Sequence, residues 1–166
     1  TRYWRDWSSD VCSSDLADAL RFVTPLAFKT LSRSPVITGL YDEEEGWKPL
    51  HVRAADEADL LLVAPATAAT LARLAQGLAD DALGCIALAL EPGTPVLVAP
   101  AMNGKMWGHP ATRANVELLR SRGVEFVGPE EGMLSCGYEG IGRMAGVEAI
   151  VGRTLERLSA GRRGRE

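Results

Sequence analysis

The chain has 166 residues, of which 46% are hydrophobic and 24% are charged, a composition typical of one folded domain. Lys and Arg number 18 against 22 Asp and Glu, and this net charge of −4 argues against a nucleic-acid binder that works through a basic face. No apolar stretch approaches the roughly 18 residues of a membrane-spanning helix. Three cysteines without a signal peptide predict a cytoplasmic protein that has no disulfide framework.

Residues 1–16 differ from the rest of the chain, because they repeat Ser-Ser-Asp and follow neither a helical nor a strand period. The run from Asp6 to Leu16 resembles the translation of a sequencing adapter, so we expect residues 1–16 to be a non-native leader that forms no regular element. A disordered natural N-terminus is the alternative. We expect an incomplete domain at residues 17–160 and a polar tail at 161–166.

Short apolar runs and helical periods alternate along the remaining chain. Thr24 followed by Pro25 is typical of a helix start, and Gly123 is typical of a helix end. In chain order we expect a helix at 22–31, a loop at 34–46, a strand at 59–65, a helix at 67–78, a helix beginning at 80–81, a strand at 95–100, a helix at 110–122, a strand at 124–127 and a helix at 147–158.

Strands that alternate with helices through short connections form a parallel sheet with right-handed crossovers. The runs at 60–64 and 95–100 are continuously apolar, as in strands that are buried on both faces. We therefore predict an α/β fold with a doubly wound parallel sheet of the Rossmann or flavodoxin type. Because three strands are too few to close such a core, we expect one or two N-terminal strands to be missing.

Ligands of such sheets bind beyond the carboxyl ends of the strands, where helix N-termini present N–H groups. The strand at 95–100 is followed by Asn103, whose amide can donate to a carboxylate without adding charge. Met102 and Met106 beside it could be plain core fillers. The strand at 59–65 is followed by small or hydroxyl residues that let a phosphate or sugar approach closely, or that simply cap an Ala-rich helix: Thr67, Ala68, Ala69 and Thr70.

The segment at 128–146 holds six glycines and shows no period, so we expect a long loop. Glycine beside Cys136 suggests a thiol that is carried on a movable flap. Cys85, in contrast, lies on the apolar face of a predicted helix and is interpreted as inert core.

The two histidines have different contexts. His51 precedes the first strand and is a candidate for acid–base work, because histidine titrates near neutral pH, although a lone histidine is more often structural. His109 precedes Pro110 and is interpreted as a helix-start residue. Neither histidine lies at a zinc spacing from another ligand, and we expect no metal site.

Three stretches together resemble the flavin-containing cysteine decarboxylases, and most closely their phosphopantothenoylcysteine decarboxylase branch. They are Pro-Ala-Thr-Ala-Ala-Thr at 65–70, Pro-Ala-Met-Asn-Gly-Lys-Met at 100–106, and Ser-Cys-Gly at 135–137 with the Gly-Arg-Met that follows at 142–144. The resemblance covers residues 17–158 in order. It implies FMN-dependent decarboxylation of 4′-phosphopantothenoyl-cysteine to 4′-phosphopantetheine in coenzyme A biosynthesis. It also implies a homotrimer or higher oligomer and, in many relatives, a fused ligase domain downstream.

The resemblance also implies roles for individual residues. His51 matches the active-site histidine, Asn103 the asparagine that holds the substrate carboxylate, and Cys136 the cysteine that protonates the ene-thiolate left by loss of CO₂. Met133 and Ser135 lie where the flap contacts substrate. The positions that match flavin contacts are Thr67, Ala68, Ala69, Thr70 and Ala101.

The sequence departs from the family pattern at two places. Ala69 stands where relatives commonly carry Asn or Asp, which removes one polar flavin contact. The Gly/Ser-rich loop that receives the FMN phosphate has no counterpart, so we expect this chain to bind FMN poorly and to have little activity. Two alternatives stay open: a decarboxylase that acts on the C-terminal cysteine of a peptide, and a non-catalytic regulatory subunit with the same fold.

Overall fold

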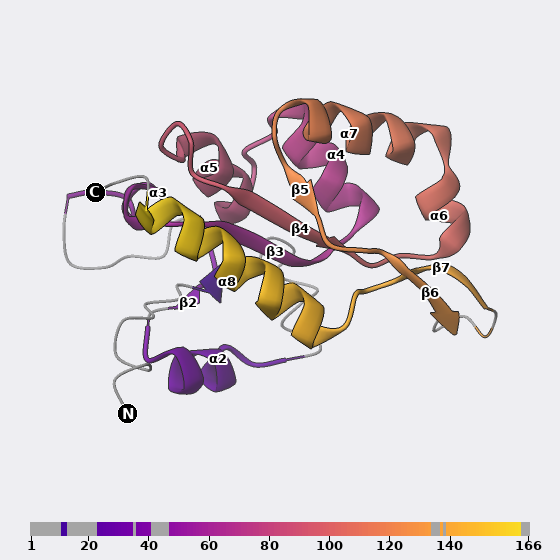
Figure 1. Cartoon of the computed structure of the whole chain (residues 1–166). Helices are drawn as coiled ribbons and strands as arrows, with labels where there is room; N and C mark the ends of the chain where they lie inside the picture. The colour runs from indigo at the N-terminus through magenta and orange to yellow at the C-terminus, as the bar shows by residue number, and fades with distance from the viewer. Residues whose placement is uncertain are drawn as a thin grey trace. The chain divides into compact units, whose positions relative to one another are not determined.

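The computed structural model describes residues 11–12, 23–34, 36–40, 47–133, 137 and 139–163. The chain divides into two compact units, and each is described by itself. The first comprises Thr1–Glu57 with Leu78–Leu90, and the second comprises Ala58–Gly77 with Glu91–Glu166. Figure 1 labels the elements of both units except β1.

In its described residues, the first unit contains a short strand pair and three helices. β1 (Val11–Cys12) pairs in parallel with β2 (Val36–Ile37), and α2 (Pro25–Ser32) contacts both strands. α3 (Leu50–Glu57) packs against α5 (Ala82–Ala89). The carboxylate of Asp81 caps α5 by accepting a hydrogen bond from Gly84 N at 2.6 Å, which confirms the helix start that the paired aspartates predict.

Three predictions for the first unit need correction. The prediction that residues 1–16 form no regular element is wrong at β1, and the loop predicted at 34–46 misses β2. Two-residue strands are defined by the partner strand, so they carry no period of their own. α3 is also absent from the predicted elements, although its eight residues are amphipathic.

The second unit is built on a parallel sheet in the order β3-β4-β5, which confirms the predicted fold class. Its strands are β3 (Leu61–Ala66), β4 (Val96–Pro100) and β5 (Glu125–Phe126). Leu97, Val98 and Ala99 of the central strand are each 0% exposed. Since consecutive strand residues point to opposite faces, β4 is buried on both faces, as its continuous apolar run predicts.

Helices lie on both sides of this sheet. α4 (Ala68–Gln76) packs against α7 (Pro110–Ser121), and Figure 1 shows the two together on one side of the sheet, with α8 (Val147–Arg163) on the other. Val116 and Leu119 of α7 are buried, as predicted. On the opposite face, Ile150 of α8 packs with Ala99 and Ala145. α8 continues to Arg163, into the segment predicted to be a polar tail.

The loop predicted at 128–146 is wrong in two segments, which form an antiparallel pair. β6 (Glu130–Met133) pairs with β7 (Glu139–Arg143), and Met133 lies opposite Glu139. Glycine occupies alternate positions of β7, at Gly140 and Gly142, so one face of that strand carries no side chains. The alternation that normally reveals a strand is therefore absent from the hydropathy pattern.

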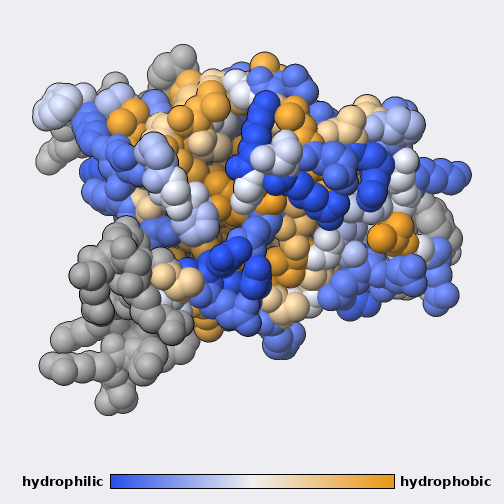
Figure 2. Space-filling model, turned by 45° about the horizontal axis from the view of Figure 1, so that its top comes forward, coloured by the Kyte–Doolittle hydropathy of each residue, from blue (hydrophilic) through white to orange (hydrophobic). Residues whose placement is uncertain are grey.

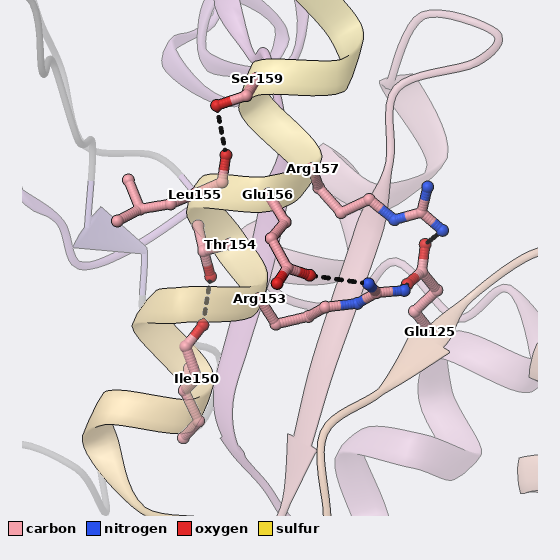
Figure 3. Close-up of polar contacts among 8 residues, drawn as sticks. All are labelled: Glu125, Ile150, Arg153, Thr154, Leu155, Glu156, Arg157 and Ser159. Atoms are coloured by element: carbon pink, nitrogen blue, oxygen red, sulfur yellow. Dashed lines mark hydrogen bonds and ion pairs between the residues drawn. The ribbon is translucent and has the colours of Figure 1, made fainter.

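Ion pairs hold α8 to the edge of the sheet (Figure 3). The Glu125 carboxylate of β5 accepts a hydrogen bond from Arg153 at 2.6 Å and pairs with Arg157, and Arg153 also donates to Glu156 at 2.9 Å. Burial raises the pKa of Glu125, but the hydrogen bonds and charges of Arg157 and Arg153 outweigh it, and the pKa lies below its ordinary value.

Some apolar side chains remain at the surface. Figure 2 shows hydrophobic side chains between hydrophilic ones on the face that it presents. On α8, Val147, Val151 and Leu155 are 64%, 49% and 41% exposed and recur at helical spacing. Among the described residues, no helix is both long and apolar enough to cross a membrane.

Candidate functional site

The carboxyl ends of β3 and β4 lie side by side in the second unit. Ala66 is the last residue of β3, and its carbonyl oxygen accepts a hydrogen bond from Ala101 N, just after β4, at 2.9 Å. This bond fixes the two connections that leave the sheet at this end. The segments with the predicted flavin contacts and the predicted carboxylate contact therefore begin at neighbouring points.

The connection after β3 leads directly into α4. Thr67 is the N-cap, and its hydroxyl oxygen accepts a hydrogen bond from Thr70 N at 3.2 Å. The hydroxyl oxygens of Thr67 and Thr70 are 3.0 Å apart, and Thr70 is buried whereas Thr67 is exposed. The capping interpretation is confirmed. Ala68 and Ala69 follow with small side chains, so the backbone of this first turn is accessible to a ligand.

The connection after β4 holds Asn103, which is half-buried and caps the short helix α6 (Gly104–Gly108). Its side-chain oxygen accepts a hydrogen bond from Lys105 N at 2.9 Å, and its carbonyl oxygen accepts one from Trp107 N at 2.9 Å. Because a backbone N–H must meet the amide oxygen, this cap also fixes which side of the amide carries the NH₂ group.

Trp107 anchors α6. It is 4% exposed, and the Arg113 guanidinium lies 5.6 Å from the centre of its ring. Met106 beside it is 49% exposed, so the interpretation of this methionine as a core filler is wrong. The indole, and not the flanking methionine, holds this turn in place. Sequence reasoning missed Trp107, although a large aromatic side chain shortly after the Asn is the signal that could have found it.

The hairpin β6–β7 contacts the loop that contains Asn103. Met102 N donates a hydrogen bond to the carbonyl oxygen of the buried Gly142, at 3.0 Å, and β7 packs against α6. Met133, at the end of β6, is 61% exposed. The predicted flap residues Ser135 and Cys136 lie outside the described residues. Gly142 was not among the predicted site residues.

The two histidines occupy different units. His51 is the second residue of α3 in the first unit, and its Nδ1 is buried without a hydrogen-bond partner among the described residues. A buried ring nitrogen without a partner costs about 1–3 kcal/mol, so a ligand or bound water that completes it would stabilise the fold. His109 caps α7, where its Nδ1 accepts a hydrogen bond from Ala111 N at 3.2 Å, which confirms its interpretation as a helix-start residue.

Cys85 has no feature of a reactive thiol. It is half-buried on α5, and its Sγ donates a hydrogen bond to Ala79 O at 3.4 Å. Burial and then the charges of Asp81 and Asp80 raise the pKa of this thiol, which disfavours the nucleophilic thiolate. Among the residues that the structure describes, no group of three or more His, Cys, Asp or Glu side chains could hold a metal ion.

A family model described as Flavoprotein matches residues 10–159. The coenzyme A biosynthesis bifunctional protein CoaBC of Bacillus subtilis is 47% identical over 133 residues, which make up 80% of this chain and 32% of that protein. The probable phosphopantothenoylcysteine decarboxylase of Streptococcus mutans is 39% identical over 140 residues, which make up 84% of this chain and 78% of that protein. This chain therefore spans about a third of the Bacillus relative and most of the Streptococcus one.

A solved structure shows the same fold. The FMN-dependent cysteine decarboxylase SpaF matches with a TM-score of 0.71 at 29% identity, and the match covers 86% of this chain and 76% of that one. SpaF and this chain therefore share the fold in which the segments after β3 and β4 lie side by side here.

Proposed function

The chain belongs to the Flavoprotein family, and from this premise we propose that it catalyses the FMN-dependent decarboxylation of 4′-phosphopantothenoyl-cysteine to 4′-phosphopantetheine. The membership agrees with the family resemblance that the sequence motifs predict. Similarity to a phosphopantothenoylcysteine decarboxylase over 78% of its length supports the reaction. The structural observation that carries the proposal is the contact between the β6–β7 hairpin and the loop of Asn103, because it brings two of the predicted site segments together.

The residues at the carboxyl end of the sheet fit a flavin nucleotide. Ala68 and Ala69 leave the first turn of α4 accessible, and the hydroxyls of Thr67 and Thr70 add polar groups beside it. We assign FMN contacts to these four residues and to Ala101. The chemistry that FMN supplies when bound is reversible two-electron oxidation of the substrate thiol, which creates the electron sink that loss of CO₂ from a saturated carbon requires.

The protein side chains bind the substrate and move protons. We assign Asn103 to the substrate carboxylate, because its capping bond to Lys105 N orients the amide NH₂ as a neutral donor. Cys136 supplies the proton that the ene-thiolate accepts after CO₂ has left, a step in which a general acid typically contributes about 10²- to 10⁴-fold in rate. We assign His51 as the active-site histidine and Met133 and Ser135 as substrate contacts, as the family resemblance implies.

The test is an assay of Cys136→Ser with 4′-phosphopantothenoyl-cysteine and excess FMN. We expect this variant to bind FMN and release CO₂ but to form no phosphopantetheine, because it cannot complete the protonation. Cys85→Ser is the matched control, since that thiol bonds to Ala79 O within its own unit, and it should match the wild type. Absence of CO₂ release by wild-type protein whose absorbance shows bound FMN would refute the proposed reaction, and normal product from Cys136→Ser would remove this thiol from it.

A second candidate is decarboxylation of another cysteine-bearing substrate, such as a peptide with a C-terminal cysteine. The similarity to SpaF, described as an FMN-dependent cysteine decarboxylase, favours it. Comparison of kcat/KM for the peptide and for 4′-phosphopantothenoyl-cysteine separates the two. The higher value identifies the substrate class.

The proposal extends to the assembly and its location. The Bacillus relative, of which this chain spans 32%, is named a bifunctional protein, and this name supports a natural polypeptide with a second activity. We propose that this second activity is the ligase domain that the family resemblance implies. We further propose a homotrimer or higher oligomer in the cytoplasm. Light scattering of the purified protein measures the oligomer, and a monomeric mass would contradict it.

A further inference from the structure

Gly142 of β7 lies against the backbone of the Asn103 loop. A Cβ built on Gly142 would lie 2.2 Å from the carbonyl oxygen of Met102, 3.2 Å from Gly104 N and 3.4 Å from the carbonyl carbon of Asn103. The three nearest atoms thus belong to Met102, Asn103 and Gly104. The middle residue, Asn103, is the one predicted to bind the substrate carboxylate. All three are backbone atoms, so no side-chain rotation can relieve the overlap.

The backbone conformation of Gly142 also disfavours a side chain at this position. Its φ is 144°, which L side chains rarely adopt, and its carbonyl oxygen accepts the hydrogen bond from Met102 N at 3.0 Å. The close approach and the hydrogen bond occur at the same residue. β7 can dock on the loop only because position 142 has no side chain.

The Asn103 loop is therefore held from two directions. Ala101 N bonds to Ala66 O of β3, and Met102 N bonds to Gly142 O of β7. Asn103 follows directly, with its side chain oriented by Lys105 N. Neither backbone bond involves a side chain, so the position of Asn103 depends on how closely β3 and β7 approach the loop that contains it.

We propose that Gly142 is a positioning residue for Asn103. This inference rests on the proposed function for its kinetic part, because there Asn103 holds the substrate carboxylate. A methyl group at position 142 must push the loop away until the contact with Met102 O exceeds the 3.0 Å that real Cβ atoms respect. A displacement of about 1 Å at a substrate-positioning group can lower the rate by about 10²-fold.

The first experiment measures amide hydrogen exchange of the full chain without substrate. In the wild type, Met102 N–H should be protected, and in Gly142→Ala the peptides that cover residues 101–107 should exchange faster. Gly123→Ala is the matched control, because Gly123 also has a positive φ, 87°, but a Cβ there would meet nothing within 4 Å. It should leave the exchange of residues 101–107 unchanged. An unprotected Met102 amide in the wild type would overturn the proposal, even if the variant does not fold.

The second experiment is a double-mutant cycle on kcat/KM with excess FMN. When Gly142→Ala is introduced into the wild-type sequence, kcat/KM should fall by about 10²-fold. When it is introduced into the Asn103→Ala variant, kcat/KM should fall almost no further, because Gly142 acts through Asn103. Both single variants should also share the same division of the loss between kcat and KM. Additive losses, or wild-type kcat/KM in Gly142→Ala, would overturn the inference. If the wild type itself releases no CO₂, the proposed function fails, and the exchange experiment still tests the role of Gly142.

Discussion

The two ends of the β3-β4-β5 sheet are held together by different kinds of interaction. At the carboxyl end, the bonds are uncharged: Ala101 N to Ala66 O, Met102 N to Gly142 O, and the caps made by Thr67 and Asn103. Toward the amino end, where Glu125 pairs in register with Leu97 near the start of β4, the charges of Glu125, Arg153 and Arg157 tie α8 to the sheet (Figure 3).

This difference separates the two tasks of the sheet. Backbone bonds fix atoms closely and add no net charge, so the partial positive charge at the start of α4 stays available to an anionic ligand. Ion pairs between long side chains tolerate movement and are weakened by solvent, since Arg153 and Arg157 are 43% and 40% exposed. We therefore expect changes at the carboxyl end to affect activity and changes at the amino end to affect only stability.

The largest expected effect is at Asn103. Asn103→Asp keeps an oxygen for the cap on Lys105 N but places a negative charge where the substrate carboxylate is proposed to bind, so kcat/KM should fall by about 10²-fold or more with unchanged stability. Asn103→Ala should lower kcat/KM by about 10²-fold, which leaves a measurable rate, and should also lose about 1 kcal/mol of stability, because the cap is lost. Assays and urea unfolding measure the two effects. An active Asn103→Asp variant would exclude the carboxylate role.

Thr67 should give a smaller effect that combines stability with cofactor binding. Thr67→Ala removes the acceptor for Thr70 N, which should cost about 1 kcal/mol of the free energy of unfolding and weaken FMN binding. Thr67→Ser retains the hydroxyl and serves as the control. Urea unfolding and a fluorescence titration with FMN test the two parts. If Thr67→Ala bound FMN as tightly as Thr67→Ser, this hydroxyl would have no part in the flavin site.

Glu125 should affect stability alone. Glu125→Gln removes the ion pairs to Arg153 and Arg157, and because these arginines are partly exposed, the loss should be about 1 kcal/mol or less. The kcat of the proposed reaction should not change. Glu117→Gln is the control, because the Glu117 side chain is 62% exposed in its pair with Arg120 and should cost almost nothing. A large loss of activity in Glu125→Gln would contradict the expectation that changes at the amino end of the sheet affect only stability.

The smallest expected effect is the pH dependence of the same pair. The pKa of Glu125 is lowered in the folded protein, so its stabilising contribution is complete above the unfolded value of about 4.3 and is lost as the pH falls through the folded value. The difference in stability between the wild type and Glu125→Gln should therefore shrink below about pH 4. A difference that stays constant down to pH 2.5 would show that the carboxylate charge contributes nothing.

Much of the second unit could be predicted from the sequence because its signals are local. Continuous apolar runs mark β3 and β4, and Thr67 and His109 each cap the helix that follows them. A capping residue acts on an amide two or three positions away, so the sequence alone contains the whole interaction. The predicted site segments at residues 67–70 and 103 follow from the same local reading of strand ends.

The parts that were missed depend on partners distant in the chain. β1 and β2 are each defined by the other strand, and β7 presents glycine where a period would be visible. The contact of Gly142 with Met102 joins residues far apart in the sequence, and nothing near either residue signals it. α6 was missed for a related reason. A helix of five residues is too short to be stable by itself, and α6 depends on the buried side chain of Trp107, which packs against the rest of the unit.

The buried indole of Trp107 also makes the candidate site optically observable. Trp107 is 4% exposed beneath the Arg113 guanidinium, whereas Trp47 is 94% exposed, so the two rings sense very different polarity. Fluorescence from the shielded ring should shift toward longer wavelength when α6 loosens, and a bound flavin nearby should quench it. After replacement of the other three tryptophans, Trp4, Trp7 and Trp47, by Phe, the emission of the chain would thus report cofactor arrival and helix undocking in real time, without any attached label.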